Sequence, residues 1–211
     1  MDYFLTAPTV QYCEAAMSAL IARPWYAISN IAFLIVGIII LLRGGRRSRL
    51  FGSIAIVVGL LSFTYDASYT YLSQLLDLSG MLVFISALLY LNLRLLVLSR
   101  QKLMAGFILS FVIAVCLIML FKGFAGDVIF GLFVLGYIAS EVYLMQTKRH
   151  TKGRLWLLAF GIFALGFLFW LCDATRAYCV DIGLFNGRAI FHYTNAVAIY
   201  LLWSFYGSQA K

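Results

Sequence analysis

Residues 24–42 read PWYAISNIAFLIVGIIILL, and this stretch decides the fold because it is predominantly apolar and carries no charged side chain. A helix needs about 20 such residues to cross the hydrocarbon core of a membrane. Similar apolar runs follow at residues 50–66, 75–98, 103–121, 126–145, 155–172 and 189–206. The sequence therefore predicts an all-α integral membrane bundle of seven transmembrane helices. It forms a single domain over residues 1–211, with residues 1–23 as an outer N-terminal segment.

The composition agrees with a chain embedded in a membrane. Hydrophobic residues make up 64% and charged residues 11% of the chain, whereas about 25% of the residues of a soluble domain are charged. The formal net charge of +8 would suggest nucleic-acid binding in a soluble protein. In a membrane protein, Lys and Arg gather in the loops on one face, so we expect no nucleic-acid partner.

The distribution of Lys and Arg predicts the orientation of the chain. With the N-terminus outside, twelve of these residues lie inside, and Arg23, Lys122, Arg176 and Arg188 lie outside. This asymmetry favours an N-terminus outside and a C-terminus inside. The short loops and small size suggest a multi-pass protein of a bacterial inner membrane, with the endoplasmic reticulum membrane as the alternative.

The outer segments hold two further features that can be tested. Residues 10–22 contain enough Ala, Met and Leu to form a short interfacial helix. Cys13, Cys172 and Cys179 fall on the outer side, where the compartment is oxidising if it is a periplasm or lumen. We hypothesise a disulfide between Cys13 and Cys179, although spacing alone leaves the connectivity open.

Ionisable residues at one membrane depth form the candidate site. Such groups cost about 2.5–3.5 kcal/mol at the centre of a membrane helix. The outer ends of the predicted helices carry Asp66, Asp77, Arg188 and His192, with Ser62 four residues before Asp66 and Asn195 three residues after His192. Each charge alone is also compatible with a snorkelling side chain or a solvated loop, but together they favour a polar cavity. Near the inner ends, we expect Glu141 to pair with a residue such as Arg94 in a structural role.

Five segments carry a resemblance to a known family. They are Tyr12-Cys13-Glu14, Ala22-Arg23-Pro24 with Ile28 to Leu34, Ser62 through Asp66 to Asp77, Cys179, and Gly187 to Ala196. In order, spacing and helix placement they resemble the ceramidase family of seven-span membrane hydrolases, especially its short bacterial members.

The resemblance implies a zinc centre that activates water. It is built from a Ser, a His four residues later, an Asp eleven residues beyond, and a His-x-x-x-His pair on the last helix. Ser62, Asp77 and His192 match this pattern, whereas Asp66 and Arg188 stand where the family has its other two histidines. A guanidinium group has no lone pair to offer a metal. We therefore expect no zinc, and instead an ion pair between Asp66 and Arg188 with His192 and Asp77 hydrogen-bonded around it.

The resemblance also implies a calcium site in eukaryotic members, to which a Glu at the position of Arg23 contributes with acids near Glu14. Arg23 offers calcium no oxygen ligand, so we expect no calcium dependence. A pair between Glu14 and Arg23 is compatible with the sequence and would contribute little if exposed.

Three functions remain open. The first is a family member without a cofactor, whose lipid-sized polar cavity near the outer face binds a membrane lipid such as ceramide, or a partner, without hydrolysis. The alternative is a hydrolase of ceramide-like or other acyl-amide lipids. In it Asp66, Asp77 and His192 hold zinc or act as acid and base, Ser62 stabilises the oxyanion and Asp77 orients water. The third is a transporter or sensor with a charge relay. The sequence identifies no protein partner.

Overall fold

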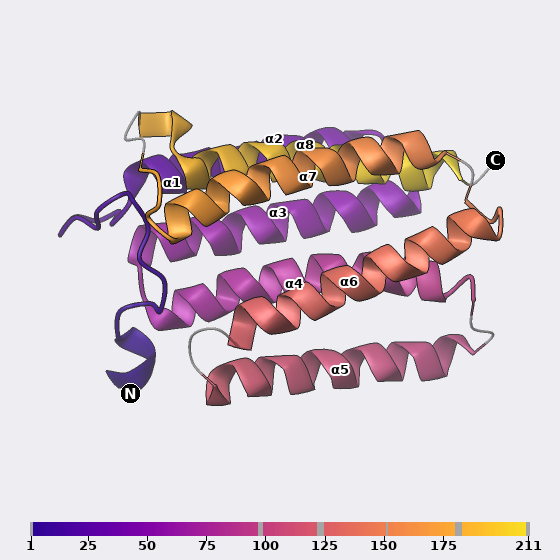
Figure 1. Ribbon diagram of the computed structural model, residues 1–211, viewed down its shortest axis with the longest axis horizontal. Helices are drawn as coiled ribbons and strands as arrows, with labels where there is room; N and C mark the ends of the chain where they lie inside the picture. Colours follow the sequence, from indigo (N-terminus) through magenta and orange to yellow (C-terminus); the bar gives the residue numbers. More distant parts are fainter. Residues whose placement is uncertain (1, 97–98, 122–124, 151, 180–182, 210–211) are drawn as a thin grey trace. The chain divides into compact units, whose positions relative to one another are not determined.

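The computed structural model of the chain is all-helical (Figure 1). It describes residues 2–96, 99–121, 125–150, 152–179 and 183–209. Within these residues there are eight α-helices and two 3₁₀ segments, η1 (Asp2–Leu5) and η2 (Gly183–Phe185), and no strand. Lys122, Lys211 and the predicted helical residues 97–98 lie outside the described part.

The helices correspond closely to the predicted membrane spans. They are α1 (Pro24–Ser29), α2 (Ile31–Leu42), α3 (Gly45–Ser68), α4 (Tyr71–Leu93), α5 (Arg100–Leu120), α6 (Ala125–Gln146), α7 (Gly153–Ala174) and α8 (Gly187–Ser208). By length and apolarity, six segments of the described residues can cross a membrane, with α1 and α2 together forming the first. The all-helical, multi-pass prediction is thereby confirmed. The predicted seventh span coincides with α8, which has the length but is less apolar because it carries Arg188, His192 and Asn195. The count of seven spans and the orientation of the ends stay predictions.

Two helix boundaries differ from the predicted ones for local reasons. Helix α3 starts at Gly45 rather than near residue 50, so the basic residues before the apolar run lie in its first turns. Gly44 and Gly45 precede and open this helix with φ of 69° and 88°, a left-handed conformation that glycine adopts without steric cost. Helix α4 ends at Leu93, and residues 94–96 form a turn.

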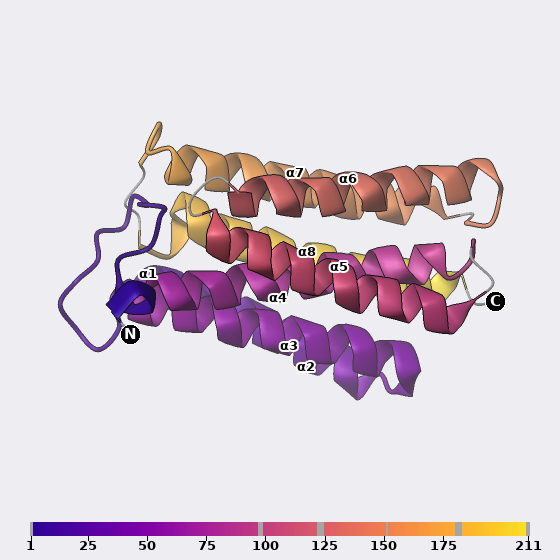
Figure 2. The same ribbon diagram turned by 90° about the horizontal axis from the view of Figure 1, so that it is seen from below.

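The chain divides into two compact units, which we describe separately. The first comprises residues 1–77 and 152–211 and contains α1, α2, α3, α7 and α8. Within it, α2 lies along α3 and α7 lies along α8 (Figure 1). The second comprises residues 78–151 and contains most of α4 together with α5 and α6. Its α5 and α6 are joined as consecutive antiparallel helices (Figure 2).

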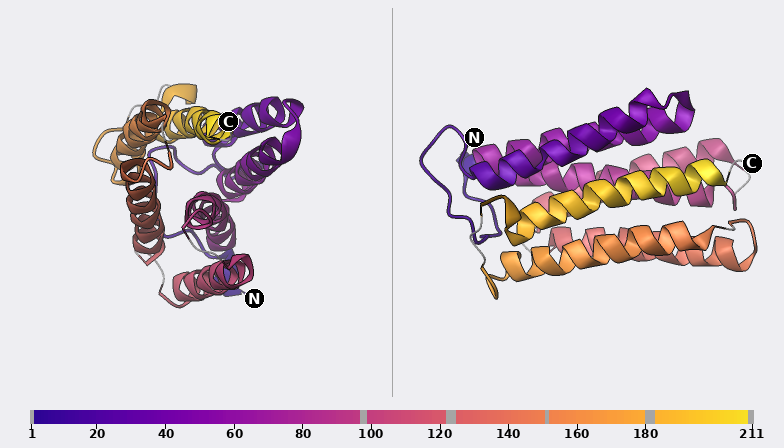
Figure 3. Two further views of the ribbon diagram at one scale, coloured as in Figure 1. Left: turned by 90° about the vertical axis from the view of Figure 1, so that its right-hand side faces the viewer. Right: turned by 90° about the horizontal axis from the view of Figure 1, so that it is seen from above.

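The predicted interfacial helix at residues 10–22 is wrong. These residues form an irregular segment beside the ends of α7 and α8 (Figure 3). Its backbone groups bond to other parts of the first unit: the amide of Cys13 donates to Asp173, and the amide of Ala22 donates to the carbonyl of Ala67. These tertiary hydrogen bonds override the weak helical preference of the Ala-rich stretch.

Candidate functional site

The carboxylate of Asp66 is the centre of the site. It is fully buried in the last turn of α3. Its Oδ1 accepts hydrogen bonds from Nη2 of Arg23 at 2.9 Å and from Nε of Arg188 at 3.0 Å, and its Oδ2 accepts from Nδ2 of Asn30 at 3.0 Å. Arg23 precedes α1, Asn30 lies at the break between α1 and α2, and Arg188 is in the first turn of α8. One carboxylate therefore joins four helices of the first unit.

Arg188 lies between two carboxylates. Besides its bond to Asp66, its Nη2 donates to Oδ2 of Asp77 at 3.2 Å and its Nη1 donates to the hydroxyl of Tyr12 at 2.8 Å. Ser62, one turn before Asp66 in α3, lies close to the side chain of Asp77. The planar fork of the guanidinium group matches this set of acceptors. Arg188 thus occupies the space between the two acids that the sequence singled out.

The start of α8 holds Arg188 in position. The side chain of Asn186 accepts a hydrogen bond from the amide of Ala189 at 2.9 Å and caps the helix. The backbone amide of Arg188 donates to Oδ2 of Asp173 at 2.8 Å. A carboxylate at a helix N-terminus is favoured by the helix dipole as well as by this hydrogen bond. Asp173, at the end of α7, is therefore a supporting residue that the sequence analysis did not identify.

Arg23 is a second buried cation in the same site. It is 0% exposed, and its guanidinium carbon lies 4.1 Å from the ring centroid of Tyr69 and 4.9 Å from that of Tyr65. The rings of Tyr12 and Tyr26 lie at 5.0 and 5.3 Å. A desolvated cation–π contact contributes about 2 kcal/mol or more. Nε and Nη1 of Arg23 have no hydrogen-bond partner in the described residues. The charge is therefore stabilised by Asp66 and by the four surrounding tyrosine rings.

The side chains of Arg23, Arg188, Asp66 and Asp77 form what we call the Arg–Asp cluster. Two guanidinium groups face two carboxylates, and all four residues are buried. An isolated charge in such surroundings costs several kcal/mol, whereas a cluster in which each charge faces one of opposite sign avoids part of that cost. The site is therefore electrically neutral with no further ion.

His192 lies one turn after Arg188 in α8 but contacts a different residue. Its Nδ1 is 2.6 Å from Oγ of Ser29, and the hydroxyl of Ser29 also lies 2.6 Å from the carbonyl oxygen of Tyr26. Because the hydroxyl has one proton and gives it to that carbonyl, Nδ1 of His192 is the donor and Nε2 of the neutral ring carries the lone pair. The expected hydrogen bond from His192 to the ion pair is replaced by this one. Asn195 is partly buried and joins none of these contacts within the described residues.

The pair between Glu14 and Arg23 that the sequence left open does not form among the described residues. The carboxylate of Glu14 instead accepts hydrogen bonds from the amides of Trp25 and Tyr26, both at 3.0 Å, and so caps the start of α1. Partial burial raises the pKa of Glu14, and the two amide hydrogen bonds oppose that shift. Arg23 turns inward because Asp66 and four tyrosine faces are available there. The tyrosines near the outer helix ends were the one signal in the sequence that pointed to a buried cation.

A disulfide joins Cys13 to Cys179 and closes the N-terminal segment over this end of the first unit. Next to it, Oδ1 of Asp173 accepts from the amide of Cys13 and from the hydroxyl of Tyr26, each at 2.8 Å. Cys172 is free. The segment that carries Tyr12 is therefore fixed by one covalent bond and by the carboxylate that also supports Arg188.

In the second unit, Glu141 does not pair with Arg94 as expected. Its carboxylate is fully buried and lies 2.6 Å from Nδ1 of His150 and 2.9 Å from Nδ2 of Asn92. The amide of His150 bonds back to the carbonyl of Leu144 and directs the imidazole toward Glu141. Arg94 is exposed.

The family model described as Ceramidase matches residues 6–206, nearly the whole chain. The chain belongs to the ceramidase family. No curated protein sequence matches it significantly. The resemblance drawn from the five sequence segments is confirmed at the level of the family.

The side-chain atoms that could coordinate a metal in this ceramidase-family chain do not fit the zinc that the resemblance implies. Both oxygens of Asp66 and one oxygen of Asp77 already accept hydrogen bonds from guanidinium or amide groups, and Arg188 itself has no lone pair. Among the described residues, no group of three or more His, Cys, Asp or Glu is arranged to hold a metal ion. The arrangement pairs charges within the protein.

Proposed function

We propose that this chain is a ceramidase-family membrane protein that binds a ceramide-like lipid in a polar cavity near its outer face and does not hydrolyse it. The Arg–Asp cluster stands where relatives would hold zinc. The observation that carries the proposal is the position of Arg188, which donates to Asp66 and to Asp77 at once. A group without a lone pair cannot activate water as a metal does.

The charges of the cluster support a site that works without a cofactor. A zinc ion would bring two positive charges to the buried acids, and here Arg23 and Arg188 bring the same number. The fold around Asp66 and Asp77 is thereby stabilised without a metal. Arg23 also supports calcium independence, because it offers no oxygen ligand where the resemblance places a Glu.

Family membership supports the choice of lipid, and the apolar helices support a multi-pass membrane location. We further place the protein in a bacterial inner membrane with its N-terminus outside. The basis is the short loops and the excess of Lys and Arg on the opposite side. The endoplasmic reticulum is the alternative location.

An acyl-amide hydrolase with an altered site is the alternative function, and one observation favours it. The lone pair on Nε2 of His192 and the hydroxyl of Ser62 beside Asp77 are groups that acid–base chemistry uses. Purified protein in lipid nanodiscs with a fluorescent ceramide tests this alternative. We expect no release of fatty acid above that of a matched His192→Ala variant, and release by the wild type alone would favour the hydrolase.

Metal analysis tests the proposal directly. We expect no stoichiometric zinc in the purified wild type. The triple variant Asp66→His/Arg188→His/Arg23→Glu restores the ligands implied by the resemblance and keeps the cluster neutral once a dication is bound. It should gain about one zinc per chain, whereas Asp66→His alone keeps both arginines and should gain none. Stoichiometric zinc in the wild type, or no zinc in a folded triple variant, would contradict the proposal.

A further inference from the structure

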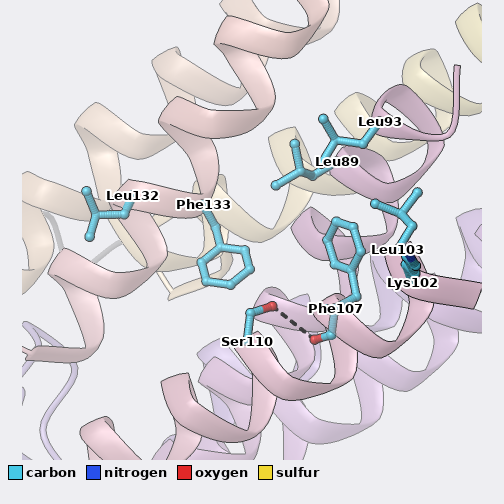
Figure 4. Close-up of a pocket in the computed structure, with 9 residues that line it drawn as sticks. Leu89, Leu93, Lys102, Leu103, Phe107, Ser110, Leu132 and Phe133 are labelled. Carbon is cyan, nitrogen blue, oxygen red and sulfur yellow. Dashed lines mark hydrogen bonds between the residues drawn. The ribbon is translucent and has the colours of Figure 1, made fainter. Parts of the chain in front are cut away.

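A cavity in the second unit is lined by none of the residues of the Arg–Asp cluster. It has a volume of about 450 Å³ and lies between α4, α5 and α6 (Figure 4). Leu89, Phe107 and Phe133, one from each helix, face the same space. The volume falls within the range of about 300–1,000 Å³ that is usual for small-molecule sites.

The lining of this cavity suits a hydrocarbon chain. Nearly all of it is aliphatic or aromatic, and the hydroxyl of Ser110 is occupied by a hydrogen bond to the carbonyl of Phe107 at 3.0 Å. Leu132, on the rim, is 62% exposed, so the cavity opens to its surroundings. Around a membrane-spanning helix those surroundings are lipid, which supplies acyl chains at high local concentration.

One positively charged side chain lines this cavity. Among the residues that the structure describes, Lys102 is the only charged one that lines it. Residues 78–151 contain six Lys and Arg but only the acids Asp127 and Glu141, and Glu141 is buried against His150. In the described part of the chain Lys102 therefore has no carboxylate partner. A lysine ammonium binds phosphate as a point charge, and no acidic residue lines the cavity to receive the ammonium of a zwitterionic headgroup.

From this pairing of an apolar cavity with a single cation, we propose that the second unit binds one anionic phospholipid. An acyl chain occupies the space between Leu89, Phe107 and Phe133, and the phosphate contacts Lys102. The site uses none of the residues of the Arg–Asp cluster. It therefore stands whether or not the proposed function of that cluster is correct.

Gly106 allows the cavity to be filled without damage to the fold. It lines the cavity, and a Cβ atom placed on it would meet no other atom within 4 Å. Leucine also favours a helix more than glycine does. Gly106→Leu should therefore fold normally and block the cavity for the acyl chain. Gly131→Leu is the matched control, because Gly131 on α6 has equally open surroundings and does not line the cavity.

The experiment measures which lipids stay bound to the full-length protein. Protein taken from nanodiscs of equal phosphatidylglycerol and phosphatidylcholine is examined by native mass spectrometry, with a parallel sample given oleate. We expect the wild type to retain one phosphatidylglycerol about fivefold in preference to phosphatidylcholine, the factor supplied by one lysine near an anionic headgroup. Gly106→Leu should lose both lipids, because its side chain fills the space that the acyl chain needs, and Gly131→Leu should lose neither.

Lys102→Gln tests the contact with the lipid phosphate separately from the contact with the acyl chain. It should abolish the preference for phosphatidylglycerol, while Lys152→Gln, which changes an exposed lysine that does not line the cavity, should leave it unchanged. Equal retention of the two phospholipids by the wild type, or full retention by Gly106→Leu, would overturn the proposal. Retention of oleate in place of phosphatidylglycerol would also overturn it, since the occupant would then be a free fatty acid. Lys102 is exposed, so its variant stays informative even if Gly106→Leu unfolds.

Discussion

Replacing Asp66 by Asn tests whether balanced charge stabilises the Arg–Asp cluster. The amide is close in shape to the carboxylate but neutral, so Arg23, which is 0% exposed, would lose its carboxylate partner. Within the Arg–Asp cluster, Arg188, which is 3% exposed, would keep Asp77 alone. Removing one partner of a buried ion pair costs about 3–5 kcal/mol. In a chain of this size 1 kcal/mol lowers Tm by about 2–4 °C. We therefore expect Tm to fall by about 6–20 °C when helix content is followed on heating in detergent.

Two comparisons make this prediction decisive. Asp127→Asn removes an exposed acid from the first turn of α6 and should change the free energy of unfolding by less than about 0.5 kcal/mol. Asp66→Asn/Arg188→Gln removes one charge of each sign and should recover part of the lost stability, since the charges then balance again. If Asp66→Asn is no more harmful than Asp127→Asn, or if the double variant loses the sum of both single effects, charge balance does not stabilise the site.

Three further predictions concern the surroundings of the cluster. Reduction of the Cys13–Cys179 disulfide, which spans 166 residues, should lower stability by about 2–5 kcal/mol; an unchanged Tm in reductant would contradict this. Folding raises the pKa of Glu14 and so favours its protonated form. The resulting contribution to stability is present below the ordinary pKa of 4.5, and it is lost as the pH rises through the raised pKa. Glu14→Gln should flatten that part of the pH–stability profile, and an identical profile would refute the assignment. Gly166→Ala should cost about 1–3 kcal/mol, because a Cβ atom there collides with α8, whereas Gly161→Ala meets open space and should be neutral or slightly stabilising in the same thermal assay.

The helices were predictable because apolarity is a property of the local sequence. A run such as residues 103–121 has to be helical in a bilayer, since no water is present to satisfy its backbone groups. The predicted ranges accordingly agree with the helices to within a few residues, apart from the turn after Leu93. The helix predicted for residues 10–22 does not form, because backbone groups of this segment bond to distant residues.

Part of the site could also be predicted from the sequence. Asp66 and Arg188 could be related because they introduce opposite charges at two positions that the resemblance assigns to one ion. The role of Arg23 could not be foreseen, since a basic residue before a proline in an outer segment is ordinarily solvated. Only the approach of Asp66 and of four tyrosine rings makes its burial favourable. His192 likewise bonds to Ser29, which the spacing of the last helix does not indicate.

The amino-acid sequence alone determined that this chain is an all-helical membrane protein of the ceramidase family, and that one expected ligand position is held by a cation. The helices follow from the apolarity of short runs, and the family follows from the resemblance of five segments. The cation is notable because a guanidinium group has no lone pair, and it stands where that resemblance implies a ligand. Tertiary structure decided that a second arginine enters the same site and that Glu14 caps α1. Those outcomes depend on which groups meet across the fold, because a buried charge is tolerated only where partners from distant segments surround it.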